Sequence, residues 1–181
     1  MQKKVLSCDK ISSKQLMKLY KINLNFIKGI SKWNFNNNKN QRQPIINEAL
    51  SEGIIQLFIC EHEGRKCINS FKKCGDLLCN KSIIEVKCFS TNAPISFGSS
   101  KWNELYILDA TNFKNNIFEI YKCKLSNLSR TFQNIKLYGN KKYSDFYKSG
   151  KRCKITFGNL KNQLKYNLKL VFSGSIQQLE K

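Results

Sequence analysis

The apolar residues of this chain fall in short runs, and the two longest cover only residues 54–60 and 83–89. Runs of that length suit buried β-strands, whereas a helix that spans a bilayer needs about 20 apolar residues. The basic stretch at residues 1–14 also lacks the apolar block of a signal peptide. We therefore expect a sheet-containing protein that is cytoplasmic (intracellular) and has no membrane segment.

The spacing of apolar residues predicts the order of the elements. A helix is expected over residues 12–31, then a polar loop at 34–43 and a short helix at 44–52 that ends at Gly53. Strands are predicted at 54–60, 76–79, 83–89, 105–109, 117–124, 131–137, 153–157 and 166–172, loops at 61–73 and 90–101, another helix at 141–149, and frayed structure over the last eight residues. This order predicts one domain of the α/β (α+β) class, with a mixed central sheet flanked by helices.

The chain is strongly basic, with 32 Lys and Arg against 12 Asp and Glu and a net charge of +20. A charge of that size predicts a polyanionic partner, and nucleic acid is favoured over an anionic membrane. An AT-rich gene would account for abundant Lys, but it does not account for the scarcity of Asp and Glu. A role at a membrane surface needs a helix with a basic face and a broad apolar face, for which residues 12–31 are a modest candidate.

The cysteines do not resemble a zinc site. None of the eight cysteines forms a C-x-x-C pair, and His62 is the single histidine. A site built from Cys67, Cys74, Cys79 and His62 is therefore disfavoured, because zinc sites usually show closely spaced ligand pairs. Reduced thiols in a cytosolic protein are the simplest interpretation. His62 itself is expected to be a loop residue and not a catalytic base.

Four charged residues lie in the otherwise apolar stretch at residues 74–90, and three of them, Asp76, Glu85 and Lys87, interrupt its predicted strands. A hairpin that turns at residues 80–81 places Asp76 directly opposite Glu85, with Cβ atoms about 5 Å apart. Lys87 points to the same face as Glu85 because it lies two residues further along the strand. Opposed carboxylates repel unless a cation lies between them, and such oxygen ligands suit Mg²⁺. The alternative is a solvated edge strand with a surface Glu–Lys pair, and the pattern alone does not decide between the two.

These residues also resemble a known family. The pattern G-D-x8-E-V-K at residues 75–87, after a Glu-bearing helix, resembles the PD-(D/E)XK nuclease core. Residues 83–110, IIEVKCFSTNAPISFGSSKWNELYILDA, are similar to the signature stretch of a group of small type II restriction endonucleases that cut GCNGC-type sites. QRQPIINEALSEG and SGKRCKITF are similar to the helix before the hairpin and to a late basic strand of that group, so the resemblance covers about residues 40–160.

The resemblance implies a single nuclease domain over residues 1–181, with a restriction-endonuclease-like catalytic core at about 44–125 and a helical segment at 1–33. The implied reaction is Mg²⁺-dependent hydrolysis of double-stranded DNA at a short, GC-containing palindromic site. The implied partners are a second copy in a homodimer and a cognate DNA methyltransferase. Where the family has Pro before its first acid, this chain has Gly75, and Ser99 and Cys153 also depart from the pattern, which leaves an inactive copy as an alternative.

The resemblance assigns the catalytic roles to single residues. Asp76 and Glu85 correspond to the metal ligands and Lys87 to the catalytic lysine. The helix acid is Glu52 or Glu48. Glu52 is favoured because it lies at the border of the buried face on a helical wheel, whereas Glu48 lies nearly opposite that face.

A loop at residues 92–102 follows the catalytic strand and is expected beside the scissile phosphate. The candidate DNA contacts in and beyond this loop are Asn92, Ser96, Lys101, Arg152 and Lys154. Phe97 and Trp102 are expected to anchor the loop on the core. The competing functions are a structure-selective resolvase or repair nuclease on the same core, and a basic nucleic-acid-binding protein without catalysis.

Overall fold

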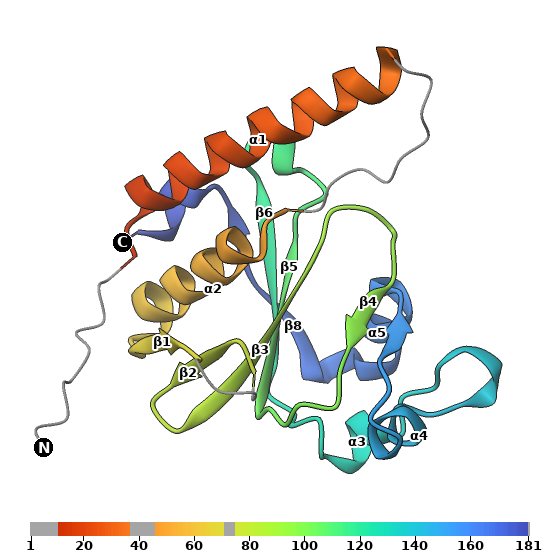
Figure 1. Ribbon diagram of the computed structural model, residues 1–181. Helices are drawn as coiled ribbons and strands as arrows, with labels where there is room; N and C mark the ends of the chain where they lie inside the picture. The colour runs from red at the N-terminus through yellow and green to blue at the C-terminus, as the bar shows by residue number, and fades with distance from the viewer. Residues whose placement is uncertain (1–10, 37–45, 71–74, 181) are drawn as a thin grey trace, which may run out of the picture.

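The computed structural model describes residues 11–36, 46–70 and 75–180, and its centre is a six-stranded mixed sheet (Figure 1). The strand order is β1-β2-β3-β5-β6-β8, in which β3 and β5 run parallel and the other neighbours run antiparallel. The strands are β1 Cys67–Asn69, β2 Leu77–Cys79, β3 Ser82–Phe89, β5 Glu104–Asp109, β6 Phe118–Cys123 and β8 Leu168–Gly174. A separate antiparallel pair is formed by β4 Ile95–Phe97 and β7 Cys153–Ile155.

Helices cover both faces of the sheet. The α-helices of the described ranges are α1 Ser13–Asn36, α2 Glu48–Glu63, α3 Arg130–Gln133, α4 Tyr143–Lys148 and α5 Phe157–Leu164, and the 3₁₀ turns are η1 Phe113–Asn115, η2 Tyr138–Asn140, η3 Lys165–Asn167 and η4 Ile176–Leu179. One face of the sheet carries α2, with α1 packed across it, and the other carries the β4–β7 pair with α3, α4 and α5 (Figure 1). This arrangement confirms the expected mixed sheet flanked by helices.

Side chains alternate between two hydrophobic cores because successive residues of a strand point to opposite faces. On β5, Tyr106 and Leu108 pack into the core beneath α2, whereas Leu105 and Ile107 pack into the core beneath β4 and α5. The same alternation in β3 decides which face of the sheet Glu85 and Lys87 occupy. None of the helices in the described ranges is both long and apolar enough to span a bilayer.

The prediction of a strand at residues 54–60 is wrong, because α2 continues as one helix to Glu63. The run from Ile54 to Ile59 is buried on every side between α1 and the sheet, so it has no polar face and shows no helical period. Gly53 does not end the helix. A Cβ atom on Gly53 would lie 2.6 Å from Leu16 Cδ2, so its missing side chain allows α1 to approach. The helix ends at Gly64, which adopts a left-handed φ of 64°.

Some predictions for the other elements are confirmed, and others are wrong. The helices predicted at 12–31 and 141–149 correspond to α1 and α4, but residues 131–137 contain the short helix α3 where a strand was predicted. The last residues are not frayed, since Ile176 and Leu179 of η4 are buried. His62 lies in the last turn of α2 and not in a loop. Its ring stacks on Phe58 at 5.0 Å, and its Nε2 lies 3.1 Å from the carbonyl oxygen of Leu179, which indicates a structural role.

The prediction of reduced cysteines is wrong for one pair. Cys67 and Cys79 are register partners on β1 and β2, and the structure joins them in a disulfide. Neighbouring antiparallel strands bring their Cα atoms to 4.1 Å, a proximity that sequence spacing does not reveal. Cys74 of the disfavoured zinc cluster lies outside the described residues. Within the described part of the chain, Cys60, Cys88, Cys123 and Cys153 are free.

Candidate active site

The β2–β3 hairpin forms in the predicted register. Cys79 pairs with Ser82, and Leu77 pairs with Ile84. Asn80 takes the left-handed turn position with a φ of 55°, a conformation that Asn tolerates better than most residues. Turn chemistry and apolar alternation were therefore sufficient to set this register.

The direct opposition of Asp76 and Glu85 does not form, which corrects the expected ladder. The pairing slips by one residue, so that the Asp76 N–H donates to the Ile84 carbonyl at 2.8 Å. The Asp76 carboxylate then accepts the Val86 N–H through Oδ2 at 2.7 Å. The slip follows Gly75, whose φ of 63° excludes proline, and on which a Cβ atom would lie 2.7 Å from the Ile84 carbonyl oxygen. Gly75 thus fixes the Asp76 carboxylate at the edge of β3.

The expected catalytic residues Asp76, Glu85 and Lys87 line one cleft with a volume of about 670 Å³. The other residues of its wall are Glu48, Gly75, Ser96, Gly98, Ser99, Ser100 and Arg152. They come from the first turn of α2, from the approach to β2, from β4 with the loop that follows it, and from the residue before β7. The cleft therefore lies where the pairing of β2 with β3 ends.

Glu85 is the most buried carboxylate of the cleft, with 7% of its surface exposed. Burial raises the pKa of Glu85; Lys87 opposes that rise and the nearby Asp76 adds to it. Lys87 Nζ lies 2.5 Å from Glu85 Oε1, and the charge of Arg152 also favours the ionised carboxylate. The cleft thus holds the desolvated carboxylate of Glu85 near that of Asp76. The ionised form of Glu85 depends on the positive charge of Lys87 and Arg152.

The helix acid Glu52 belongs to the same electrostatic cluster. Burial, together with the charges of Asp76 and Glu48, raises the pKa of this half-buried residue to about 7, against the effect of Lys87. Glu52 is not among the residues that line the cleft, whereas Glu48 is, although the helical wheel favoured Glu52 and placed Glu48 away from the buried face. Glu48 reaches the cleft because it lies one turn before Glu52, at the end of α2 where the cleft opens.

The donor set fits a hard divalent cation. Mg²⁺ typically takes one or two carboxylates from the protein and completes its shell with waters and substrate phosphate. Asp76 and Glu85 supply two carboxylates, and the raised pKa of Glu85 shows that added positive charge would stabilise its ionised form. Among the described residues, no three Asp, Glu, His or Cys side chains converge as a complete protein-only metal cluster.

Replacing Glu52 by glutamine is expected to stabilise the metal-free protein at high pH. A carboxyl group whose pKa is raised in the folded state contributes stability below its unfolded pKa and loses that contribution as pH rises to about 7. Because solvent screens this half-exposed group, the variant should gain only about 1–2 kcal/mol over the parent at about pH 8, and almost nothing at about pH 4. Urea unfolding in EDTA at both pH values measures this. An equal gain at both would contradict the assignment of the raised pKa.

The expected DNA contacts do not all gather at the cleft. Ser96 and Arg152 line it, and Lys154 is exposed on β7 as the register partner of Ser96. Asn92 instead lines a separate hollow of about 470 Å³ beside Phe89 and Asp109. Lys101 is exposed one residue beyond the cleft wall at Ser100.

The loop that forms one wall of the cleft is anchored by the core, as expected. Phe97 and Trp102 are each 1% exposed, and Trp102 packs edge-on against Phe132 at 4.8 Å. Sequence patterns did not reveal the polar anchors. Asn127 is fully buried and donates through Nδ2 to the Ser100 carbonyl at 2.6 Å, and the Tyr143 hydroxyl donates to the Gly98 carbonyl at 3.1 Å. Both anchors are distant in sequence from the loop that they hold.

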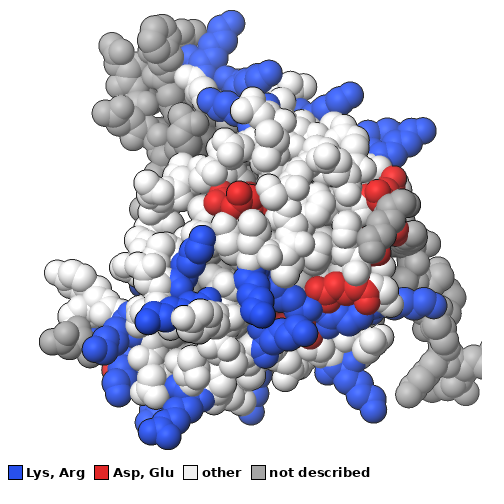
Figure 2. Space-filling view, turned by 180° about the vertical axis from the view of Figure 1, so that it is seen from behind, with Lys and Arg blue, Asp and Glu red and all other residues white. Residues whose placement is uncertain are grey.

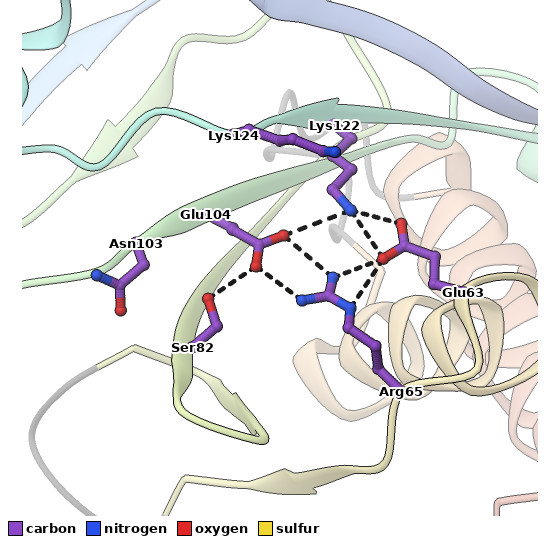
Figure 3. A pocket seen from close by; sticks show the side chains of 7 residues that line it. All are labelled: Glu63, Arg65, Ser82, Asn103, Glu104, Lys122 and Lys124. Carbon is purple, nitrogen blue, oxygen red and sulfur yellow. Dashed lines mark hydrogen bonds and ion pairs between the residues drawn. The ribbon is translucent and has the colours of Figure 1, made fainter.

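A second group of charges is drawn in Figure 3. It lies on the face of the sheet that carries α2, because Glu104 points to the same face as Tyr106. Arg65 binds Glu104 through two nitrogens at 2.7 and 3.0 Å and Glu63 at 2.6 and 2.9 Å. Lys122 Nζ lies 2.7 Å from both Glu63 oxygens and 3.4 Å from Glu104 Oε2. Burial alone would raise the pKa of Glu104, but hydrogen bonds from Arg65 and Ser82 lower it to about 2. We call these four residues, Glu63, Arg65, Glu104 and Lys122, the charge network.

Comparison with known proteins found no match: no family model, no curated protein and no solved structure matches this chain. The functional argument therefore depends on the geometry of the cleft and on the chemistry of its residues.

Proposed function

We propose that this protein is a Mg²⁺-dependent deoxyribonuclease of the PD-(D/E)XK type. The observation that carries the proposal is the meeting of Asp76, Glu85 and Lys87 in one cleft, with Glu85 buried and its pKa raised. A carboxylate kept in such a place costs stability, and groups with perturbed pKa values in a cleft are typical of functional sites. The order of elements supports the proposal, because α2 precedes a three-stranded antiparallel meander that carries the acids.

Each residue has a chemical role in this proposal. Asp76 and Glu85 hold Mg²⁺, which when bound supplies positive charge to the phosphate oxygens. In the hydrolysis, the oxygen of a water molecule bonds to phosphorus and the bond from phosphorus to the leaving sugar oxygen breaks, while the water proton passes to that oxygen through solvent. Lys87 orients the attacking water or stabilises the charge that develops on the phosphate. Glu52 lies close enough to Asp76, Glu85 and Lys87 for their charges to shift its pKa.

The cleft also has residues suited to a phosphate backbone. Ser96, Arg152 and residues 98–100 line it, and Lys154, the register partner of Ser96, extends this basic edge along β7. Hydroxyl, guanidinium and amide groups are the usual ligands of DNA phosphates. The net charge of +20 supports DNA as the substrate.

The resemblance described above refines the proposal to a type II restriction endonuclease. In that case the enzyme acts as a homodimer on a short, GC-containing palindrome, because two active sites related by a twofold axis match a palindromic duplex. A methyltransferase of the same specificity then protects the host DNA. Lys101 and Asn92 remain candidate contacts to DNA that extends beyond the cleft.

Digestion of a plasmid of known sequence, with Mg²⁺ and with EDTA, tests the proposed function. We expect cleavage only with Mg²⁺, with discrete bands whose mapped ends share one short sequence. Cleavage at branched or damaged structures, without a shared sequence, would instead indicate a resolvase or repair nuclease. Salt-dependent binding without cleavage under any metal condition would identify a non-catalytic binding protein and refute the proposal.

A further inference from the structure

Five lysines of α1 lie on one stripe of the helix. The sequence of α1 places them four, three, seven and four residues apart, and Asn25 fills the missing position of the stripe. At about 100° per residue, the five side chains fall within an arc of about 80°. All five are exposed, and they are Lys14, Lys18, Lys21, Lys28 and Lys32. We call these five residues the lysine stripe.

The lysine stripe faces away from the body of the protein. The opposite side of α1 is fixed to the core by Leu16, Tyr20, Asn23 and Ile27, which are at least 92% buried. Basic side chains project along the edge of the molecule where α1 lies (Figure 2). The helix contains no Asp or Glu, so no acidic side chain of α1 offsets these charges. A straight row of outward-facing cations therefore lies outside the cleft.

We propose that the lysine stripe binds the phosphate backbone of duplex DNA as a second contact surface. Lys14 and Lys32 are 18 residues apart, which corresponds to about 27 Å of helix at about 1.5 Å per residue. A DNA strand rises about 3.4 Å per phosphate along the duplex axis, so the stripe is as long as about eight base pairs, and it can contact a few of their phosphates on one side of the duplex. This inference deepens the proposed function, since it takes DNA as the partner, but it does not depend on cleavage.

The observations favour DNA over a lipid surface. Three apolar residues on a flank of α1, Ile22, Phe26 and Trp33, are 65%, 59% and 43% exposed. A helix that lies in a membrane interface needs a broad apolar face, with its basic residues on the polar side. The broad apolar face of α1 is instead buried in the protein through Leu16, Tyr20 and Ile27. The exposed surface of α1 therefore consists of a narrow apolar flank and a broad cationic outer side.

The test replaces all five lysines of the stripe with glutamine and measures how DNA affinity depends on salt. Glutamine forms helices about as well as lysine, so α1 should persist, and circular dichroism checks this. Fluorescence anisotropy with a labelled duplex in EDTA gives the slope of log affinity against log salt. Each phosphate contact contributes about 0.9 to that slope, so we expect the variant to lose about 2–4 units of slope.

A matched control carries the same loss of charge on other exposed surfaces, in the variant K81Q/K114Q/K136Q/K165Q/K169Q. The control should lose less than half as much slope as the α1 variant. Equal losses would mean that only net charge matters and would overturn the inference. Stronger binding of the parent protein to vesicles of phosphatidylcholine and phosphatidylserine than to duplex, abolished by the α1 substitutions, would also overturn it.

The two proposals fail in different ways. A protein that shows the expected slope difference but never cuts DNA would refute the proposed nuclease and keep the lysine stripe as a DNA contact. A protein that cuts with Mg²⁺ while both quintuple variants show the same slope would keep the nuclease and refute the role of the stripe.

Discussion

Replacing Glu85 by alanine is expected to reduce Mg²⁺-dependent DNA cleavage by about 10³-fold or more, because removal of one preorganised electrostatic group alone costs about 10²–10³-fold. Glu85 is one of the two carboxylates that we assign to the metal. Its Oε1 lies 2.5 Å from Nζ of Lys87, the candidate catalytic lysine. The substitution thus removes a ligand and also frees the lysine from its partner. Initial cleavage rates on a supercoiled plasmid measure the effect.

The matched control is Glu119→Ala, which removes a half-buried glutamate from β6, away from the cleft wall. That variant should cleave at nearly the parental rate. DNA affinity in EDTA should be retained by both variants, because neither removes a basic contact. Cleavage by the Glu85 variant at the parental rate would exclude Glu85 from the active site.

Replacing Arg65 by methionine is expected to destabilise the protein by about 3 kcal/mol at neutral pH, the range seen when one member of a buried ion pair is removed. Arg65 is 21% exposed and holds Glu63 and Glu104 together in the charge network. Without the guanidinium, two carboxylates remain close together with only the Lys122 ammonium between them. Urea unfolding at neutral pH measures the loss.

The pH dependence of that loss provides a second check. The pKa of Glu104 is lowered to about 2, so its contribution to stability is present above its ordinary pKa and disappears as pH falls from about 4.5 towards 2. The difference between the Arg65 variant and the parent should therefore shrink in acid. Arg130→Met, at an exposed position, should change stability by less than about 0.5 kcal/mol. If Arg65→Met lost as little stability as Arg130→Met, the charge network would contribute little to the stability of the fold.

The two groups of charges in this molecule differ in a way that separates structure from function. In the charge network, two carboxylates meet two cations, and the pKa values of Glu63 and Glu104 are lowered. At the cleft, the pKa values of the wall residue Glu85 and of its neighbour Glu52 are raised, because burial and neighbouring acids outweigh the cations that are present. A folded chain gains nothing from such an excess of acids unless a ligand brings positive charge to it.

Local sequence signals were enough to predict the part of the site that one hairpin builds. The turn at Asn80 and the alternation through β3 placed Glu85 and Lys87 on one face, and the structure agrees. The slip at Asp76 was not predicted, because the simplest register assumes an unbroken ladder and Gly75 breaks it.

Features that depend on contacts between distant segments could not be predicted from the periodicity of the sequence. Residues 54–60 belong to a helix, and periodicity did not reveal it because residues 54–59 are buried between α1 and the sheet, which removes the polar face that identifies a helix. Asn127 holds the cleft loop from 27 residues away, and Arg65 meets Glu104 across 39 residues. Such contacts are fixed by how the layers pack and leave no repeat in the sequence.

Binding of a divalent ion by the cleft is the central claim, and a Mn²⁺ titration followed by electron paramagnetic resonance tests it most directly. The parent protein should bind one Mn²⁺, and Mg²⁺ should displace it. Asp76→Asn should weaken that binding by at least about 10-fold, whereas Asp109→Asn, outside the cleft, should leave it unchanged. Equal Mn²⁺ binding by the parent and the Asp76 variant would contradict the account.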